Sequence, residues 1–290
     1  MKPFPVPVVA LLGPGSQEDE SPAYLPMPQG MSTYQPPSLP EPDELAAHGG
    51  CVAVLREALA ALRRPGAAAV AYRIDLGHLV EADRSLLNQV LGEGEVAAQV
   101  RADADADADA DELRVQESVF AGVWRVVRLQ QGKVVADALE VGACPEGLVA
   151  AAHAAATAFD ATGAPLPPGV MNAPSLLAEL DDRRRRWRPG DAAHVVNLTL
   201  LPLSEADSAY LDAVLGAGRV QILSRGYGNC RIVDTRMPRT WRVTYFNSTD
   251  IVILDTLEVC RVPEVACAAA QDLHDSAERL AEVLQWVRAG

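Results

Sequence analysis

The chain has 290 residues, of which 49% are hydrophobic, 22% are charged and only 5% are aromatic. A chain of this length can bury a core that is stable without a disulfide or a structural metal, and it allows one large domain or two smaller ones. The formal net charge of −14 argues against nucleic-acid binding, because such proteins need a positive surface to release counterions. It also argues against docking on anionic lipid.

Cysteine use and hydropathy predict a soluble cytoplasmic protein. The five cysteines are odd in number and irregularly spaced, which does not fit a disulfide framework and is typical of a reducing compartment. The first apolar run, Val8 to Leu12, is short and flanked by prolines, unlike the core of a signal peptide. No run reaches the roughly 20 apolar residues that cross a bilayer, so we expect no membrane insertion.

Residues 1–44 form a proline-rich leader. They contain eleven of the 21 prolines, whose missing amides and fixed φ angles prevent a helix or a central strand. We expect either a disordered leader or a strap, because apolar residues such as Phe4, Leu11 and Tyr24 could lie on the body or on a partner. From Glu44 the apolar residues fall at helical spacing, and Pro65-Gly66 ends the predicted helix.

The strongest signal in the sequence is an internal repeat. Three strings recur in the same order at one constant spacing: Pro65-Gly66 as Pro189-Gly190, Glu81-Ala82-Asp83 as Glu205-Ala206-Asp207, and Val90-Leu91-Gly92 as Val214-Leu215-Gly216. Two more recur at a slightly shorter spacing: Trp124-Arg125-Val126 as Trp241-Arg242-Val243, and Leu139-Glu140-Val141 as Leu257-Glu258-Val259. The spacing shortens because the first copy contains an extra Asp-Ala alternation at 102–111, which buries little and predicts a solvated acidic loop.

Each copy predicts the same succession of elements. A helix ends at Pro-Gly, and a strand, a second helix, four strands and a closing helix follow. The strands expected in the first copy are 68–76, 95–101, 114–120, 123–130 and 134–141, and those in the second are 193–201, 219–224, 230–235, 240–246 and 251–259. Short polar turns between the strands favour antiparallel pairing. We expect Trp124 and Trp241 to occupy equivalent core positions.

The predicted fold class is therefore α+β with an internal duplication. Two similar halves, each an antiparallel sheet of about four to five strands packed by helices, are expected to be related by a pseudo-twofold axis. The first repeat covers 45–160, the linker 161–170 and the second repeat 171–290.

The two copies differ most at one loop, and this difference identifies the candidate partner-binding segment. The second copy carries Arg225, Gly226, Tyr227, Gly228, Asn229, Cys230 and Arg231, where the first has only the acidic loop. The glycines allow close approach of a backbone to a partner, and the arginines could hold a carboxylate. Neighbouring guanidinium charge would lower the pKa of the Cys230 thiol. The alternative is a glycine-rich turn with a buried cysteine and solvated arginines.

We find no convincing metal or catalytic set in the sequence. Cys230, Cys260 and Cys267 could together hold a transient metal or cluster, but they lack a Cys-x-x-Cys pair and are more simply core residues. His48 and Cys51 have ligand-like spacing without a second pair. No Walker loop, Rossmann fingerprint or nucleophile elbow is present. We therefore expect no catalytic residue, no metal and no cofactor.

Three strings resemble one known family. Ser224 to Arg231, Tyr245-Phe246-Asn247-Ser248 and Leu257 to Ala269 are similar to the HupH/HyaF family of bacterial hydrogenase expression proteins, also represented by HoxQ. The leader agrees at Phe4-Pro5-Val6-Pro7 and at Tyr24 to Gly30. The resemblance implies an accessory protein for maturation of an uptake [NiFe]-hydrogenase. Proteins of this kind resemble cytoplasmic chaperones for the precursor of the iron–sulfur small subunit, which carries a twin-arginine export signal.

Three functions stay open at this point. The acidic composition, the lack of a catalytic set and the resemblance favour a chaperone whose partner is the small-subunit precursor, with other hydrogenase accessory proteins as further partners. An iron–sulfur or metal-delivery factor would need the second-half cysteines to converge. An enzyme acting on a small molecule would need a deep pocket around Arg225 and Cys230.

Overall fold

The computed structural model describes residues 40–101, 112–154, 166–226 and 229–289. The expectations for the acidic loop 102–111 and for most of the leader therefore concern residues outside these ranges, as do Tyr227 and Gly228 of the candidate segment. The last residues of the predicted leader belong to a helix, because the first described helix begins at Pro42. None of the helices in the described segments combines the length and the hydropathy that crossing a bilayer requires.

The described elements follow the predicted order closely. The first half contains α1 (Pro42–Ala47), α2 (Gly49–Leu62), β1 (Tyr72–Asp75), α3 (Glu81–Leu91), β2 (Val96–Val100), β3 (Glu112–Glu117), β4 (Val123–Gln130), β5 (Lys133–Val141) and α4 (Glu146–Ala154). The second contains α5 (Ala173–Arg186), β6 (His194–Asn197), the 3₁₀ helix η1 (Leu198–Leu200), α6 (Glu205–Leu215), β7 (Ala217–Ser224), β8 (Asn229–Thr235), β9 (Thr240–Phe246), β10 (Val252–Val259), the 3₁₀ helix η2 (Glu264–Ala266) and α7 (Ala270–Ala289).

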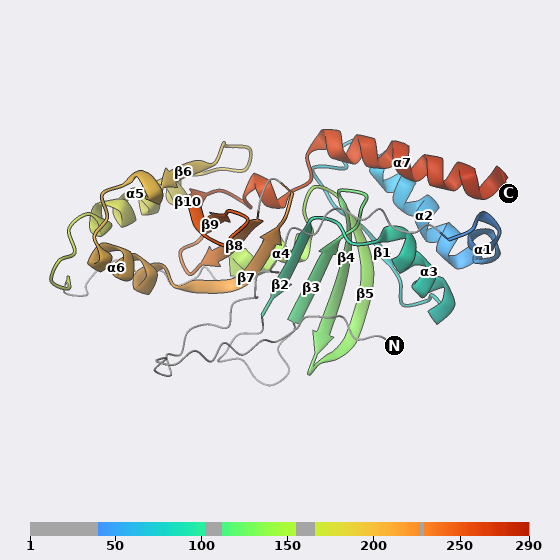
Figure 1. Ribbon diagram of the computed structural model, residues 1–290, viewed down its shortest axis with the longest axis horizontal. Coiled ribbons are helices and arrows are strands. Elements are labelled where there is room, and N and C mark those ends of the chain that lie inside the picture. Colours follow the sequence, from blue (N-terminus) through green and yellow to red (C-terminus); the bar gives the residue numbers. More distant parts are fainter. Residues whose placement is uncertain (1–39, 102–111, 155–165, 227–228, 290) are drawn as a thin grey trace.

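The ten strands of the described ranges form one continuous antiparallel sheet in the order β1-β5-β4-β3-β2-β7-β8-β9-β10-β6 (Figure 1). Read inward from either edge, the order within each half is the same. The α+β class and the antiparallel pairing are confirmed, but the expectation of one sheet for each half is wrong. The innermost strands β2 and β7 pair with each other, with Ala98 opposite Ile222 at the centre of the pairing. Pairing satisfies backbone groups that two separate edges would leave open.

The closing helices tie the halves together. Helix α7 packs on α1 and α2 of the first half, and α4 packs on β2 and β7 at the junction. In Figure 1, α7 lies along α2 at one end of the molecule, whereas α5 and α6 lie at the other end. The main core accordingly joins Leu55 of α2 and Leu280 of α7 to sheet residues from both halves, including Trp124 and Trp241. Both tryptophans are fully buried, as predicted.

The repeated Glu-Ala-Asp string has a structural role at the start of a helix. The Asp207 carboxylate accepts N–H bonds from Met171, Asn172 and Ala173, at 2.8, 2.9 and 2.9 Å, and so caps α5. The Asp207 carboxylate also completes a capping box with Ser204 at the start of α6. The bond from the Ala173 amide contributes most to holding the pKa of Asp207 well below its usual range. In the first half, Asp83 instead bonds His48, the N-cap of α2, at 2.8 Å.

Candidate binding site

The candidate segment lies at the end of the sheet where β7 is followed by β8. Arg225 is exposed, and its N–H donates to the carbonyl oxygen of Glu95 at 3.1 Å, just before β2. A Cβ on Gly226 would meet the end of the Glu95 side chain, which would have to move aside, so the segment lies close to Glu95. The segment is therefore attached to the junction between the two halves, and its Arg225 is exposed to solvent.

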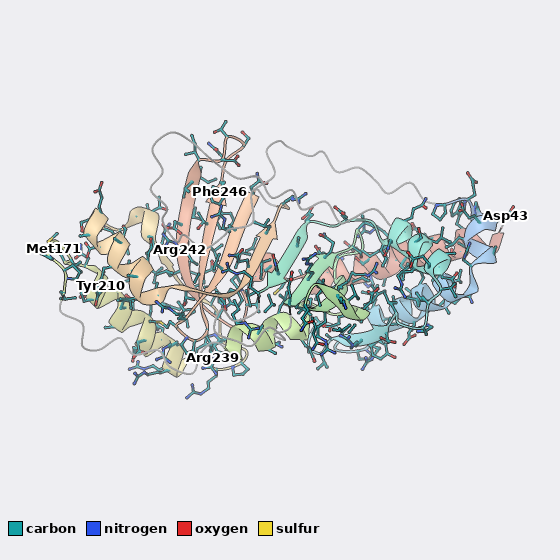
Figure 2. The ribbon with its side chains drawn as sticks, turned by 90° about the horizontal axis from the view of Figure 1, so that it is seen from below. Asp43, Met171, Tyr210, Arg239, Arg242 and Phe246 are labelled. Carbon is teal, nitrogen blue, oxygen red and sulfur yellow. The ribbon has the colours of Figure 1, made fainter. Side chains whose placement is uncertain are left out.

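Arg231 and the β9–β10 hairpin extend this surface. The Arg231 guanidinium lies over the Phe246 ring, 5.3 Å from its centroid. Phe246 ends β9, and Figure 2 shows it at the tip of the strands. In the following turn the Asn247 side chain accepts N–H bonds from Thr249 and Ile251, both at 2.9 Å. Ile251, Val252 and Ile253 then expose 62%, 50% and 58% of their surface, so arginines and apolar side chains adjoin at this end of the sheet.

Cys230 does not belong to this exposed surface. It is fully buried, and its thiol hydrogen-bonds the Tyr245 hydroxyl. Successive residues of a strand face opposite sides of the sheet, so Cys230 points away from the Arg231 guanidinium. Burial, reinforced by the Glu258 carboxylate, raises the pKa of Cys230 to about 12. The expectation of a reactive thiol is therefore wrong, because the thiol is desolvated and faces the Glu258 carboxylate and not the arginines.

Two other cysteines meet at the junction of the halves. The Ala268 N–H donates to the Ala143 carbonyl oxygen at 2.9 Å, and the adjacent thiols of Cys144 and Cys267 hydrogen-bond each other. The bond to Cys144 lowers the pKa of Cys267. Cys260 is buried nearby, and burial raises its pKa. In the part of the chain that the structure describes, no three His, Cys, Asp or Glu side chains are grouped as ligands for a metal ion.

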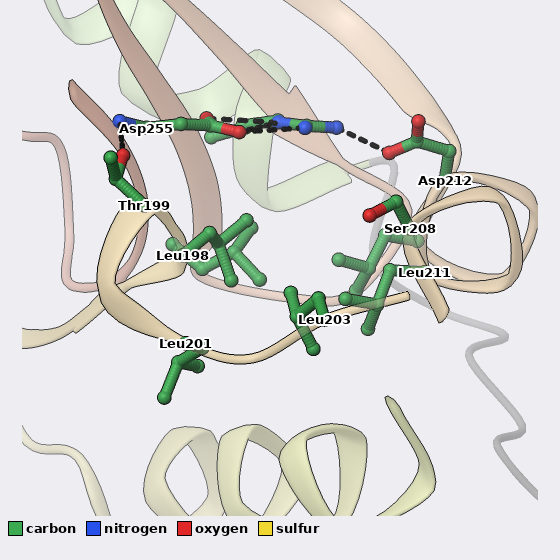
Figure 3. Close-up of a pocket in the computed structure, with 11 residues that line it drawn as sticks. Leu198, Thr199, Leu201, Leu203, Ser208, Leu211, Asp212 and Asp255 are labelled. Carbon is green, nitrogen blue, oxygen red and sulfur yellow. Dashed lines mark hydrogen bonds and ion pairs between the residues drawn. The ribbon is translucent and has the colours of Figure 1, made fainter. Parts of the chain in front are cut away.

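A cavity of about 190 Å³ lies between α6, η1 and the strands β9 and β10 (Figure 3). Leu198, Leu201, Leu203 and Leu211 form its apolar side. The opposite side is a row of charges in which Arg242 lies between Asp255 and Asp212. The Arg242 Nη2 to Asp255 Oδ2 distance is 2.7 Å, and this bond raises the pKa of Arg242 further above its usual range.

A larger cavity, of about 490 Å³, lies between α2 and α7 and is lined by Arg56, Leu59, Ala60, Arg63, Ala281, Leu284 and Gln285. Neither cavity is lined by Arg225 or Cys230. Sequence reasoning missed the cavity beside α6. The available signal was a pair of substitutions between two repeated strings, Ser208 where the first copy has Arg84 and Asp212 where it has Asn88.

The same family model matches both halves of the chain. The model, described as the HupH hydrogenase expression protein C-terminal conserved region, matches residues 50–163 and again residues 170–287. The hydrogenase expression/formation protein HoxQ of Cupriavidus necator is 54% identical over 288 residues, which cover 99% of each chain. HupH of Rhodobacter capsulatus, which has the same descriptive name, is 45% identical over 98% of each chain. The hydrogenase-1 operon protein HyaF of Escherichia coli is 36% identical over 96% of this chain and 95% of its own.

The chain therefore belongs to the HupH family of hydrogenase expression proteins, and the resemblance seen in the sequence is confirmed. Membership makes it an accessory protein of hydrogenase expression and formation. The names of HoxQ and HupH describe hydrogenase expression and formation, and that of HyaF a hydrogenase operon.

Proposed function

We propose that the protein is a cytoplasmic chaperone of [NiFe]-hydrogenase maturation that binds the precursor of the iron–sulfur small subunit before its twin-arginine export. The observation that supports this proposal is the surface at the end of the sheet where β7 and β9 end and β8 and β10 begin. There, exposed Arg225 and the stacked pair Arg231 and Phe246 adjoin the apolar hairpin end at 251–253. Arginine and aromatic side chains most often dominate interface energies. Such a role requires no catalytic residue and no cofactor.

The charge of the chain supports a basic partner. The formal net charge of −14 creates a field that attracts positively charged segments over several ångström. Salt screens such attraction, so association should slow as ionic strength rises. A transient chaperone needs only micromolar affinity, roughly −8 kcal/mol.

We also infer that the chain arose by internal duplication and that a pseudo-twofold axis relates its halves. The support comes from three observations: the repeated strings, the equal strand order of the halves, and the family model that matches twice. The β2–β7 pairing adds a fourth, because it is symmetric about Ala98 and Ile222, which are equivalent positions of the repeat.

Replacing both Arg225 and Tyr227 by alanine tests the chaperone role. We expect the thermal midpoint to stay within a few degrees of the wild type, because Arg225 is exposed, while capture of the small-subunit precursor in pull-downs is lost. Arg185→Ala, which removes an arginine of 69% side-chain exposure on α5, is the matched control and should leave capture intact. Normal capture by the double variant would place the contact elsewhere, and unfolding of that variant would make the segment a structural turn.

A further inference from the structure

One charged framework occurs at equivalent places in both halves. In the first, Arg125 Nη2 lies 2.6 Å from Asp137 Oδ2, and Arg125 Nη1 bonds the Asn88 side chain on α3. In the second, Arg242 Nη2 lies 2.7 Å from Asp255 Oδ2, and Arg242 Nη1 bonds the Asp212 side chain on α6. Helices α3 and α6 begin and end at equivalent residues of the repeat. Each half can therefore serve as a template for the other.

In the first half an arginine fills the space beside this framework. The Arg84 Nη2 donates to the carbonyl oxygens of Leu76 and Leu79, at 3.3 and 3.1 Å, and the Arg84 Nε lies 3.9 Å from Asp137 Oδ2. The equivalent residue in the second half is Ser208. Its short side chain bonds back to the Ser204 carbonyl at 3.2 Å. The 190 Å³ cavity, lined by Ser208, Leu203, Arg242 and Asp255, opens where the first half holds a guanidinium (Figure 3).

The two frameworks also differ in net charge, and this difference favours a cation in the second half. The first half sets two arginines, Arg84 and Arg125, around the single carboxylate of Asp137. The second sets one arginine, Arg242, between the two carboxylates of Asp212 and Asp255. One more cation in the cavity would balance the second set. The Asp255 side chain is only 17% exposed, and charges act more strongly at such partly desolvated positions.

The remaining walls suit the alkyl part of a long side chain. In the second half the connection from strand to helix is two residues longer. Ile74 and Val196 are equivalent strand positions, because they pair with the equivalent residues Leu139 and Leu257. The segment from Val196 to Leu203 is two residues longer than the segment from Ile74 to Leu79, the equivalent leucine. The longer connection contains η1, which supplies Leu198 and Thr199 to the cavity. Long cationic side chains bury an apolar stem while their charged end reaches polar partners.

We propose that this cavity, which we call the α6 pocket, binds an arginine side chain of a partner polypeptide in the place that Arg84 fills in the first half. A guanidinium offers several donors in a planar fork. In the first half the Arg84 Nη2 donates to two carbonyl oxygens, while the Arg84 Nε lies 3.9 Å from the Asp137 carboxylate, within ion-pair distance. An ammonium group lacks this fixed fork. The α6 pocket therefore discriminates arginine from lysine.

The α6 pocket and the surface of the proposed chaperone contact lie on one face of the second half. Arg242, Thr244 and Phe246 alternate along β9 and so share a face, and Arg231 on β8 lies opposite Thr244 in register. Figure 2 shows Arg242 and Phe246 along the same part of the sheet. They are four residues apart, or about 13 Å along a strand. An extended polypeptide can place an arginine in the pocket and apolar residues at the hairpin. The inference rests on the proposed function only in taking the partner to be a polypeptide.

The first experiment uses the full chain and small probes. Titration with N-acetyl-arginine amide, followed by NMR or calorimetry, should show saturable binding, whereas N-acetyl-citrulline amide, its uncharged isostere, should bind at least about tenfold more weakly. Lysine amide should also bind more weakly.

Asp212→Asn, which installs the first-half residue, should weaken arginine binding about fivefold. Glu205→Gln on the same helix lies outside the pocket lining and should change nothing. Equal binding of arginine and citrulline would overturn the inference.

A self-filling variant provides the decisive test. Ser208→Arg places in α6 the side chain that α3 already accommodates, so the variant should keep its thermal midpoint and lose binding of arginine amide. Unchanged binding would overturn the inference, and if this variant fails to fold, the Asp212→Asn titration still decides it.

Precursor capture separates the two proposals. If S208R captures the precursor as the wild type does, the pocket inference fails and the chaperone proposal stands. If the wild type binds N-acetyl-arginine amide but captures no precursor, the pocket inference stands and the chaperone proposal fails.

Discussion

The two halves share a strand order but are covered by helices in different ways. In the first half, α2 packs on α3 and on α7, which the second half contributes. Leu55, Leu87 and Leu280 there belong to the main core that runs across the sheet. In the second half, α5 and α6 pack on each other over a separate, smaller core that includes Leu180 and Leu211. The same backbone plan therefore gives one half whose helices belong to the core that joins the molecule, and another whose helices cover a separate core beside the α6 pocket and the apolar hairpin.

Truncating one equivalent leucine in each half should reveal this difference most strongly. Leu87 and Leu211 occupy the same position in α3 and α6, and both are buried. Leu87→Ala should lower the free energy of unfolding by about 4 kcal/mol, because a close-packed core cannot collapse around the hole. Leu211→Ala should cost about 2 kcal/mol, since Leu211 already lines the α6 pocket and loses fewer contacts. Urea unfolding measures both, and equal losses would show that the two cores are equally well packed.

A buried carboxylate at an equivalent place in each half should make stability depend on pH. Glu117 lies opposite Trp124, and Asp234 lies opposite Trp241. Burial raises the pKa of each carboxyl to about 7. The folded state therefore retains protons that the unfolded state releases above pH 4, so folding stability falls as pH rises from about 4 to about 7 and then levels off.

Substituting these carboxyls by amides should remove that dependence. We expect Glu117→Gln and Asp234→Asn each to raise the free energy of unfolding at pH 8 by about 2 kcal/mol, somewhat below the full linkage value because the new amide nitrogen needs an acceptor. At pH 4 neither should have much effect. The Asp234 acceptor bond from the Val220 N–H, at 2.7 Å, is kept by asparagine. Unfolding curves from pH 4 to 8 measure the effect. A wild-type profile that is flat over this range would contradict the assignment.

Sequence reasoning recovered the elements that depend on local patterns. The strand β4 was predicted at its observed bounds, Val123–Gln130, because apolar alternation and flanking turns identify a strand without knowledge of its neighbours. Gly92 and Gly216, which recur at equivalent places in the repeat, follow α3 and α6 with φ values of 55° and 54°, a backbone conformation that favours glycine. The pairing of β2 with β7 was missed, because nothing within either strand specifies which edge it meets.

The candidate site was predictable only in part, for the same reason. The repeat comparison made Arg225 to Arg231 the candidate segment because the two copies differ there in residue type, and its binding role stays a prediction. Which side of the sheet Cys230 faces depends on register and on burial by distant elements, so the prediction for its pKa failed. The α6 pocket depends on an ion pair between residues far apart in sequence, Asp212 and Arg242. Its substitutions were visible in the repeat, but their meaning needed the packing of α6 on the sheet.

The smallest expected difference between the halves concerns the caps of α3 and α6. Ser204 caps α6, where its hydroxyl accepts the Asp207 N–H at 3.0 Å, whereas the equivalent N-cap of α3 is Val80, which makes no side-chain cap bond and is 64% exposed. Exchanging the two residues tests the comparison reciprocally. Ser204→Val should lower the free energy of unfolding by about 1 kcal/mol, because an N-terminal amide loses its acceptor. Val80→Ser should raise it by about 0.5 kcal/mol, less than the full cap value, because Asp83 is already engaged with His48 and is not free to complete a capping box. Thermal and urea unfolding of the two single variants and the double variant measure this, and a destabilising Val80→Ser would show that Val80 contributes more by packing than a cap would add.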